Sequence, residues 1–169
     1  LMTLRTIVRV LPILAFGAGL GACQTMAAPK AEPGKAAAAA AYMAKNAKTK
    51  GVVTLPPLQY QVLKSGPADG AHPKRSDEIT VHYEGKLLNG EVFDSSFAKG
   101  EPVTFPLGRL IPGWVVGIQL MRPGDEWVFY VPPQMAYGFK DTGPIPAGSV
   151  LVFRVQLIDI KPPKDAPAG

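Results

Sequence analysis

Few residues of this chain have types that could do covalent or metal chemistry. Cys23 is its single cysteine, which excludes an intrachain disulfide and a cysteine-based zinc site. His72 and His82 lack the spacing of metal ligands, and surface roles are expected for both. Ser95 and Ser96 have no candidate histidine base at hand in the sequence. These residues therefore argue against a metal centre and against serine hydrolysis.

Residues 1–22 have the pattern of a secretory signal peptide. Arg5 and Arg9 precede an apolar run at 11–20, and small residues follow that run. The run is well short of the roughly 20 residues that a membrane-spanning helix needs. We therefore expect export of the chain rather than a retained transmembrane helix.

Cys23 ends a segment, Leu-Gly-Ala-Cys at 20–23, that resembles a bacterial lipobox. Cleavage before such a cysteine lets its thiol carry diacylglycerol and the new amino terminus a further acyl chain, and several chains together anchor firmly. Gln24 resembles the residues that permit sorting to an outer membrane. The alternative is an ordinary signal cut after Ala27 or Ala28. The expected location is periplasmic, with outer-membrane anchoring if Cys23 is acylated.

Residues 23–50 form a linker that is rich in Ala, Lys and Pro. Consecutive alanines at 36–41 favour a helix, because alanine has the best intrinsic helix propensity. The stretch has too few large apolar side chains to bury a face of its own. We expect a tether with a short helix near 35–48, and a dimerisation helix is the alternative.

The net charge of +5 is unevenly distributed along the chain. Arg5 and Arg9 belong to the expected signal peptide, and lysines are concentrated in the linker that follows it. The remaining domain is close to charge balance, which argues against nucleic acid as a partner.

Residues 51–161 are expected to fold as one domain around an antiparallel sheet, followed by a flexible tail at 162–169. Alternation of apolar and polar residues at 79–84 and at 151–158 predicts two strands with one buried face each. A third strand candidate at 58–63 opens the domain.

Two local patterns add to the expected sheet. The unbroken apolar run at 127–131 indicates a central strand covered on both faces. Asn89-Gly90 is a strong hairpin signal, because a type I′ turn needs positive φ at both central positions, so 91–94 should pair back onto the preceding strand.

One short amphipathic helix of about ten residues is expected to start at Pro112, since a first helical turn tolerates a missing N–H. Trp114, Ile118 and Met121 recur at helical spacing, and the Arg-Pro-Gly-Asp segment at 122–125 ends the pattern in a turn. The predicted fold is α+β, an antiparallel sheet of about five strands wrapped on one short helix.

Eight segments of the domain resemble the FK506-binding proteins, and within them the exported bacterial branch. The segments are GVVT at 51–54, LQY at 58–60, VHYEG at 81–85, FDSS at 93–96, PVTF at 102–105, IPGW at 111–114, AYG at 136–138 and LVF at 151–153. The resemblance implies a five- or six-stranded antiparallel half-barrel around a short helix. It also implies a peptidyl-prolyl cis/trans isomerase that needs no metal or organic cofactor.

The resemblance also implies a pocket and its residues. It assigns catalysis to Asp94, Tyr137, Phe153 and Trp114, and substrate binding to Tyr83, Phe93, Phe105, Leu110, Ile111 and Ile145. Trp114 would form the floor, and the Tyr137 hydroxyl and the Ile111 N–H would donate to substrate carbonyls. Asp94 would either stabilise the rotated carbonyl carbon or hold a neighbouring side chain in place.

Such a pocket suits the chemistry of amide rotation. The planar amide is stabilised by resonance, and rotation has a barrier of about 18–20 kcal/mol. The twisted transition state has less charge separation than the planar amide, so an apolar pocket that removes water favours it. No nucleophile or proton transfer is needed.

Three departures from the family bear on specificity rather than activity. Val103 replaces an aromatic found in many relatives, Lys99 stands where arginine is common, and the loop 139–144 is shorter and lacks a histidine. The implied partners are Pro-containing polypeptides that are unfolded or folding, with macrolide inhibitors as candidate ligands, and the expected state is a monomer.

Two other functions compete with a folding isomerase. The chain could instead be a module that holds Pro-containing segments without turnover, or a surface adhesion protein. Retention of both the acid Asp94 and the phenol Tyr137 favours the enzyme, because a site freed from catalysis would not need to keep them together.

Overall fold

The computed structural model describes residues 33–163. The expected signal peptide at 1–22, the lipidation candidate Cys23 and most of the expected tail lie outside these residues. No helix in the described part is long and apolar enough to cross a membrane.

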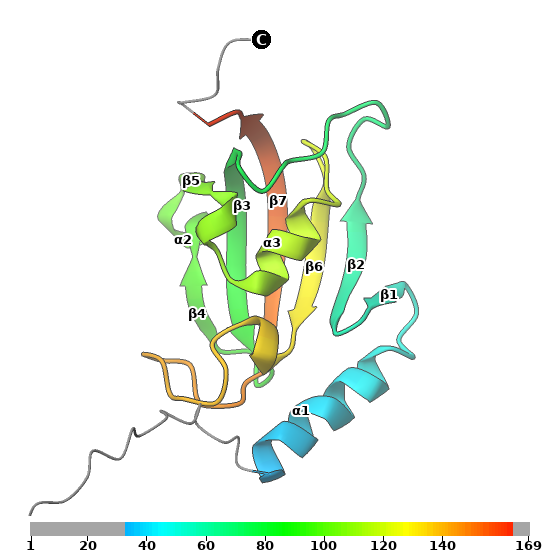
Figure 1. The fold of residues 1–169 in the computed structure, drawn as a ribbon, viewed down its shortest axis with the longest axis vertical. Coiled ribbons are helices and arrows are strands. Elements are labelled where there is room, and N and C mark those ends of the chain that lie inside the picture. The colour runs from blue at the N-terminus through cyan, green and yellow to red at the C-terminus, as the bar shows by residue number, and fades with distance from the viewer. Residues whose placement is uncertain (1–32, 164–169) are drawn as a thin grey trace, which may run out of the picture.

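Seven strands form one antiparallel sheet with the order β1-β2-β6-β7-β3-β4, and β5 pairs with β3 beside this path (Figure 1). The strands are β1 (Val52–Leu55), β2 (Leu58–Lys64), β3 (Glu78–Leu87), β4 (Val92–Ser95), β5 (Val103–Pro106), β6 (Glu126–Val131) and β7 (Leu151–Lys161). Both β5 and β4 pair with the edge of β3 that faces away from β7. The predicted α+β class with an antiparallel sheet is confirmed.

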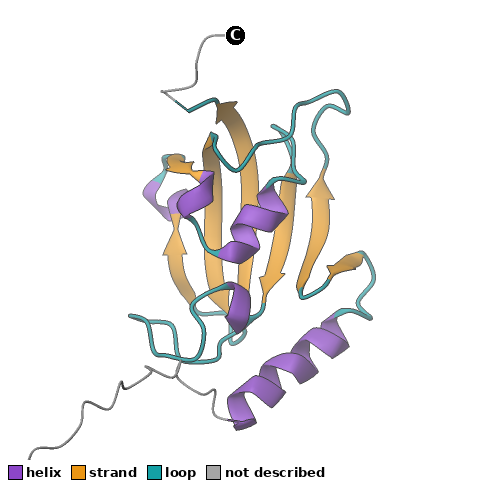
Figure 2. Cartoon of the chain, viewed as in Figure 1, coloured by secondary structure: helices purple, strands orange, loops and turns teal. Residues whose placement is uncertain are grey.

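The short helix α3 (Pro112–Ile118) packs on one face of this sheet, as Figure 2 shows. Trp114, Ile118 and Met121 are all buried, as their spacing predicts. The helix is shorter than the expected ten residues, because the chain after Ile118 tightens into i→i+3 hydrogen bonds and Met121 lies in that turn. A second short helix, α2 (Ser96–Lys99), follows β4 directly.

Glycines let α3 approach β6 closely. A Cβ at Gly113 would overlap Val131, and a Cβ at Gly117 would overlap the ring of Phe129. Both glycines lie on the same side of α3, four residues apart. They set how deeply Trp114, the residue after Gly113, enters the core.

Strand β6 differs from its expected environment. Trp127, Phe129 and Val131 are buried, whereas Val128 and Tyr130 between them remain partly exposed. The prediction that both faces are covered is therefore wrong. An antiparallel sheet packs one face on the core, and the apolar residues on the other face of β6 are only half-buried.

The hairpin predicted at Asn89-Gly90 is present but its loop is longer than expected. Gly90 N–H donates to the Leu87 carbonyl, and Leu87 N–H donates to the Glu91 carbonyl. This leaves the three residues 88–90 in the loop rather than two. Only Gly90 needs left-handed backbone geometry in such a loop, and its φ is 89°.

The helix expected near 35–48 is α1 (Pro33–Asn46). It lies across one end of the sheet, near β1 (Figure 1). Contrary to the expectation that it could bury no face, Ala39 and Met43 are buried against Val150. The small alanine side chains allow this close approach, so the contact needs few large apolar residues.

We predict that Gly117→Ala destabilises the fold. Overlap with Phe129 should cost about 1–3 kcal/mol, which exceeds the roughly 1 kcal/mol that alanine gains over glycine in a helix. Urea denaturation measures the difference. Gly34→Ala in α1 is the control, because a Cβ there meets nothing within 4 Å. An unchanged midpoint for Gly117→Ala would contradict the close packing of α3 on β6.

Candidate functional site

A cavity of about 210 Å³ is lined by residues from four strands, β3, β4, β5 and β7, from the helix α3 and from neighbouring loops. It is lined by Tyr83, Phe93, Asp94, Phe105, Leu110, Ile111, Trp114, Tyr137 and Phe153. These are the residues that the resemblance implies, with one exception. Ile145 is buried in the hydrophobic core and is not part of this lining.

Trp114 lies at the centre of this lining. Its indole meets the rings of Tyr83 and Phe153 edge-on, with centroids 5.3 Å away and interplanar angles of 82° and 83°. Phe105 makes a third contact at 6.3 Å and 80°. The Nε1 atom is buried and has no hydrogen-bond partner among the described residues. Ring contacts therefore hold the indole, and edge-to-face geometry is the favourable arrangement for such rings.

Phe93 closes the side of the cavity next to Phe153. The two rings form an edge-to-face pair with centroids 5.6 Å apart and an interplanar angle of 89°. A Cβ at Gly85 of β3 would overlap both rings. Glycine at this position therefore makes room for this aromatic wall.

Asp94 is the one carboxylate of the cavity lining, and both of its oxygens have partners. The Tyr83 hydroxyl donates to Oδ2 at 2.5 Å, and the Lys99 ammonium donates to Oδ1 at 2.9 Å. Tyr83 comes from β3, Asp94 from β4 and Lys99 from the end of α2. The carboxylate thus joins three consecutive elements at the rim of the cavity.

These contacts change the acid–base properties of the three polar side chains. The hydrogen bond from Tyr83 lowers the pKa of the Asp94 carboxyl below its usual value; burial opposes this, and the Lys99 contact adds to it. Burial, then the bond to Asp94, raises the pKa of the Tyr83 hydroxyl. Burial, then the charge of Asp94, raises the pKa of Tyr137. Both phenols are therefore protonated near neutral pH and can donate hydrogen bonds.

Two hydrogen-bond donors of the lining residues have no partner among the described residues. The Tyr137 hydroxyl makes no hydrogen bond within 33–163, although its ring lines the cavity. The backbone N–H of Ile111, just before α3, likewise donates to none of these residues. Both are available to a bound carbonyl group.

A polar cluster behind the cavity was missed from the sequence. Ser96 is fully buried, and its hydroxyl accepts from the Tyr83 N–H at 2.8 Å and lies 3.3 Å from the Tyr83 carbonyl oxygen. His82 Nδ1 lies 3.0 Å from the same hydroxyl. The expectation that Ser96 has no histidine nearby is therefore wrong. The hydroxyl is nevertheless inaccessible, so it fixes the backbone of β3 at Tyr83 rather than acting as a nucleophile.

The signal for this cluster lay in strand pairing rather than in a motif. Glu84 pairs with Ser95 across β3 and β4, which brings the neighbouring residues Tyr83 and Ser96 together.

The structure places all three departures from the family pattern. Val103 is half-buried against the core, and Lys99 forms an ion pair with Asp94. The loop at 139–144 is closed by a bridge between Thr142 and Ile145.

Within residues 33–163 no group of three or more His, Cys, Asp or Glu side chains is placed to hold a metal ion. The cavity itself offers aromatic walls, one engaged carboxylate and two free donors. This arrangement can remove water from a small apolar group and bind adjacent carbonyls.

Comparison with known proteins gives consistent matches. A family described as FKBP-type peptidyl-prolyl cis-trans isomerase matches residues 70–158. FKBP-type peptidyl-prolyl cis-trans isomerase FkpA of Aeromonas hydrophila is 51% identical over 123 residues, which are 72% of this chain and 45% of that protein. Outer membrane protein MIP of Legionella longbeachae is 42% identical over 134 residues, 78% of this chain and 56% of that protein. The chain spans about half the length of these curated relatives.

Among solved structures, the crystal structure of FkpA from Escherichia coli is similar with a TM-score of 0.70 and 42% sequence identity. The match covers 75% of this chain and 59% of that chain. This likeness includes the antiparallel sheet and its short helices.

We predict that Tyr83→Phe raises the pKa of the Asp94 carboxyl, because the strongest interaction that favours its ionised form is lost. Lys99→Met should raise it less. Carboxyl carbon shifts in an NMR titration measure both effects. Since the folded-state pKa is depressed, Asp94 contributes stability at neutral pH that is lost as the pH falls through that value. An unchanged pKa in Tyr83→Phe would show that the hydrogen bond does not act on the carboxylate.

Proposed function

The chain belongs to the FKBP-type peptidyl-prolyl cis-trans isomerases, and from that premise we propose that its cavity accelerates rotation about X-Pro bonds in exported proteins. The observation that carries the proposal is the aromatic cavity around Trp114, with unpaired donors at Tyr137 and Ile111. The proposed clients are Pro-containing polypeptides that are still folding.

The cavity would lower the rotation barrier by stabilising the twisted amide more than the planar amide. Water stabilises the polar planar amide more than the twisted one, so aromatic walls that exclude water favour rotation. An acceleration of about 10⁵ needs only about 7 kcal/mol of such differential stabilisation. The proline ring would pack on the indole of Trp114, between Phe105 and Phe153.

Hydrogen bonds position the peptide on either side of this ring. The Tyr137 hydroxyl and the Ile111 N–H would each donate to a substrate carbonyl, and no acceptor within the described part of the chain competes for them. Donation to a carbonyl in a water-poor site is stronger than in water. These two bonds would hold the chain while the X-Pro bond turns.

Asp94 is proposed to act as a positioning group. Both of its oxygens are occupied by Tyr83 and Lys99, which supports holding a neighbour over direct contact with a substrate carbon. Ser96 fixes the same Tyr83 from its backbone side. The ring of Tyr83 would thereby keep its angle against Trp114.

The place of action is proposed to be the cell envelope. The signal pattern at 1–22 supports export, and the relative from Legionella longbeachae is named an outer membrane protein. Acylation of Cys23 would anchor the chain there, with the domain facing the periplasm as a monomer. Macrolides that mimic a prolyl segment would compete for the same cavity, with an affinity altered by Val103.

We predict that the purified chain accelerates cis-to-trans conversion of an X-Pro peptide in a proline-limited assay. Tyr137→Phe should lower kcat/KM about fivefold to tenfold, the value of one lost hydrogen bond. Asp94→Ala should lower it at least as much, and Asp94→Asn should retain more, because an amide oxygen still accepts from Tyr83.

Tyr130→Phe is the matched control, since Tyr130 lies on the outer face of β6 and does not line the cavity. Absence of acceleration by the unmutated chain, with peptide binding intact, would replace the isomerase with a holding module. A loss in Tyr130→Phe equal to that in Tyr137→Phe would mean that the assay reports folding rather than the cavity.

We also predict that the mature amino terminus is an acylated Cys23. Mass spectrometry of the protein extracted from its native membrane should give the mass of a chain that starts at Cys23 and carries diacylglycerol and an acyl group. A mature chain that starts after Ala27 or Ala28, or one with a free Cys23 thiol, would exclude the lipoprotein.

A further inference from the structure

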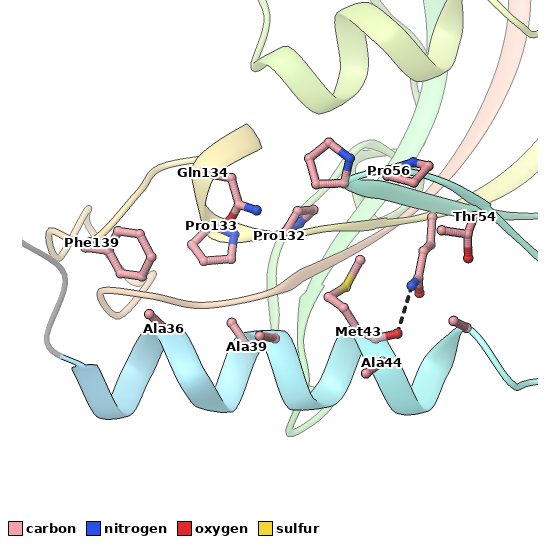
Figure 3. Close-up of a pocket in the computed structure, with 14 residues that line it drawn as sticks. Ala36, Ala39, Met43, Ala44, Thr54, Pro56, Pro132, Pro133, Gln134 and Phe139 are labelled. Carbon is pink, nitrogen blue, oxygen red and sulfur yellow. Dashed lines mark hydrogen bonds between the residues drawn. The ribbon is translucent and has the colours of Figure 1, made fainter.

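The hollows outside the aromatic cavity differ in whether they continue it. A cavity of about 540 Å³ lies between α1 and the end of the sheet (Figure 3) and shares no lining residue with the aromatic cavity. A smaller hollow, of about 160 Å³, lies beside the start of α3 and shares Leu110 with the aromatic cavity. Its other lining residues are Arg75, Pro112, Val115 and Val116, and we call it the Arg75 hollow. This smaller hollow is the one that extends the site.

The segment 110–112 forms the border between the two spaces. Leu110 lines both of them, Ile111 lines the aromatic cavity and Pro112 lines the Arg75 hollow. The Ile111 N–H, which has no acceptor within 33–163, belongs to this border. A client chain that accepts a hydrogen bond from that N–H would therefore pass along the edge of the Arg75 hollow.

Arg75 is positioned at the hollow by the backbone beside it. A Cβ at Gly108 would lie 2.9 Å from the Arg75 carbonyl oxygen and 3.3 Å from its Cγ, so the arginine stem crosses the bare backbone of this glycine. The Leu107 N–H donates to the Asp77 carbonyl at 2.9 Å, which joins the loop of the arginine to the 3₁₀ turn that contains Gly108. The base of the Arg75 side chain is thus in place before a client binds.

The guanidinium of this exposed arginine makes no hydrogen bond or ion pair within 33–163. The acids near it in the chain are placed elsewhere. Asp77 is buried and accepts from the Lys74 N–H at 2.7 Å. Glu78 lies on the outer face of β3, opposite the core face on which α3 packs. Asp69 belongs to the loop that contacts Arg122, beyond the end of α3. The charge therefore remains available to a ligand.

A cation beside an apolar surface suits the side chain of glutamate. Pro112, Val115 and Val116 bring no polar side-chain atom to the hollow, so a methylene stem can pack on them while its carboxylate reaches the guanidinium. Arginine binds carboxylates through a fork of parallel N–H donors. Lys74 and Arg109, both exposed next to this segment of the chain, would repel a cationic side chain.

We propose that the Arg75 hollow binds the side chain two positions from the proline of a client and selects glutamate there. The inference rests on the proposed function, because it names a sequence preference of that same site. In an extended chain, side chains two residues apart point to the same side and lie about 7 Å apart. A prolyl ring in the aromatic cavity would therefore direct that neighbour to the adjoining hollow. The hollow lies away from the rotating bond, so it lowers KM and leaves kcat unchanged.

The test follows the full chain in the proline-limited assay with peptides that carry Gln, Glu or Lys two positions before the proline in one series and two positions after it in another. In one of the two series Glu should lower KM about threefold relative to Gln, as expected for one partly exposed ion pair, and Lys should raise it. Arg75→Glu should reverse the order of Glu and Lys. Lys74→Glu is the matched control and should keep Glu first, because Lys74 is the exposed neighbour with the same charge but lies outside the hollow.

Binding of the same peptides, measured by fluorescence anisotropy, separates this inference from the proposed function. Peptides that bind with the glutamate preference but are not accelerated would contradict the isomerase and support the hollow. Equal KM values and affinities for Glu and Gln in both series would overturn the proposal, and so would equal effects of Arg75→Glu and Lys74→Glu. A preference that appears in kcat rather than KM would also overturn it, because the glutamate would then act at the rotating bond. At an ionic strength of about 1 M, where the Debye length is about 3 Å, most of the preference should disappear.

Discussion

The candidate site depends on one packing constraint, the enclosure of the Trp114 indole by aromatic rings at nearly right angles. Tyr83, Phe105 and Phe153 come from three different strands, so their contacts with Trp114 exist only when β3, β5 and β7 are in register. The indole makes no hydrogen bond that could hold it otherwise. The sheet thus positions these aromatic rings around the cavity. Glycines at 113 and 117 complete the constraint, because they set the depth of α3 in the core.

Polar residues beside the aromatic rings hold one of these rings, that of Tyr83, in place. Asp94 holds the tip of Tyr83, and Ser96 holds its backbone, so that ring is fixed at both ends. Their hydrogen bonds are used within the protein, which leaves the cavity itself poor in polar groups. The donors that remain unpaired within the described residues belong to Tyr137 and Ile111, which both line the cavity. A site of this kind suits a reaction in which charge separation decreases and no proton moves, which agrees with the family to which the chain belongs.

Local patterns predicted those parts of the fold that depend on local physics. Alternation found β3 and β7, and helical spacing found the buried side of α3 at Trp114 and Ile118. The family resemblance named every residue of the cavity lining, but it also named Ile145, which is buried in the core instead. The features that the sequence did not predict depend on contacts between residues far apart in the chain. The His82–Ser96 contact follows from the register of β3 and β4. The outer face of β6 is half-buried because the strand belongs to an antiparallel sheet that packs only its other face on the core. The helix α1 packs against Val150, a contact that its alanine-rich sequence does not indicate.

The central claim is that the prolyl ring packs on Trp114 while its preceding bond rotates. Exchange NMR of an X-Pro peptide with a small amount of the full chain tests both parts at once. The account predicts cis/trans exchange peaks that appear only with the protein, together with contacts from the proline ring to the rings of Trp114 and Phe153. Exchange without those contacts, or those contacts without exchange, would contradict it.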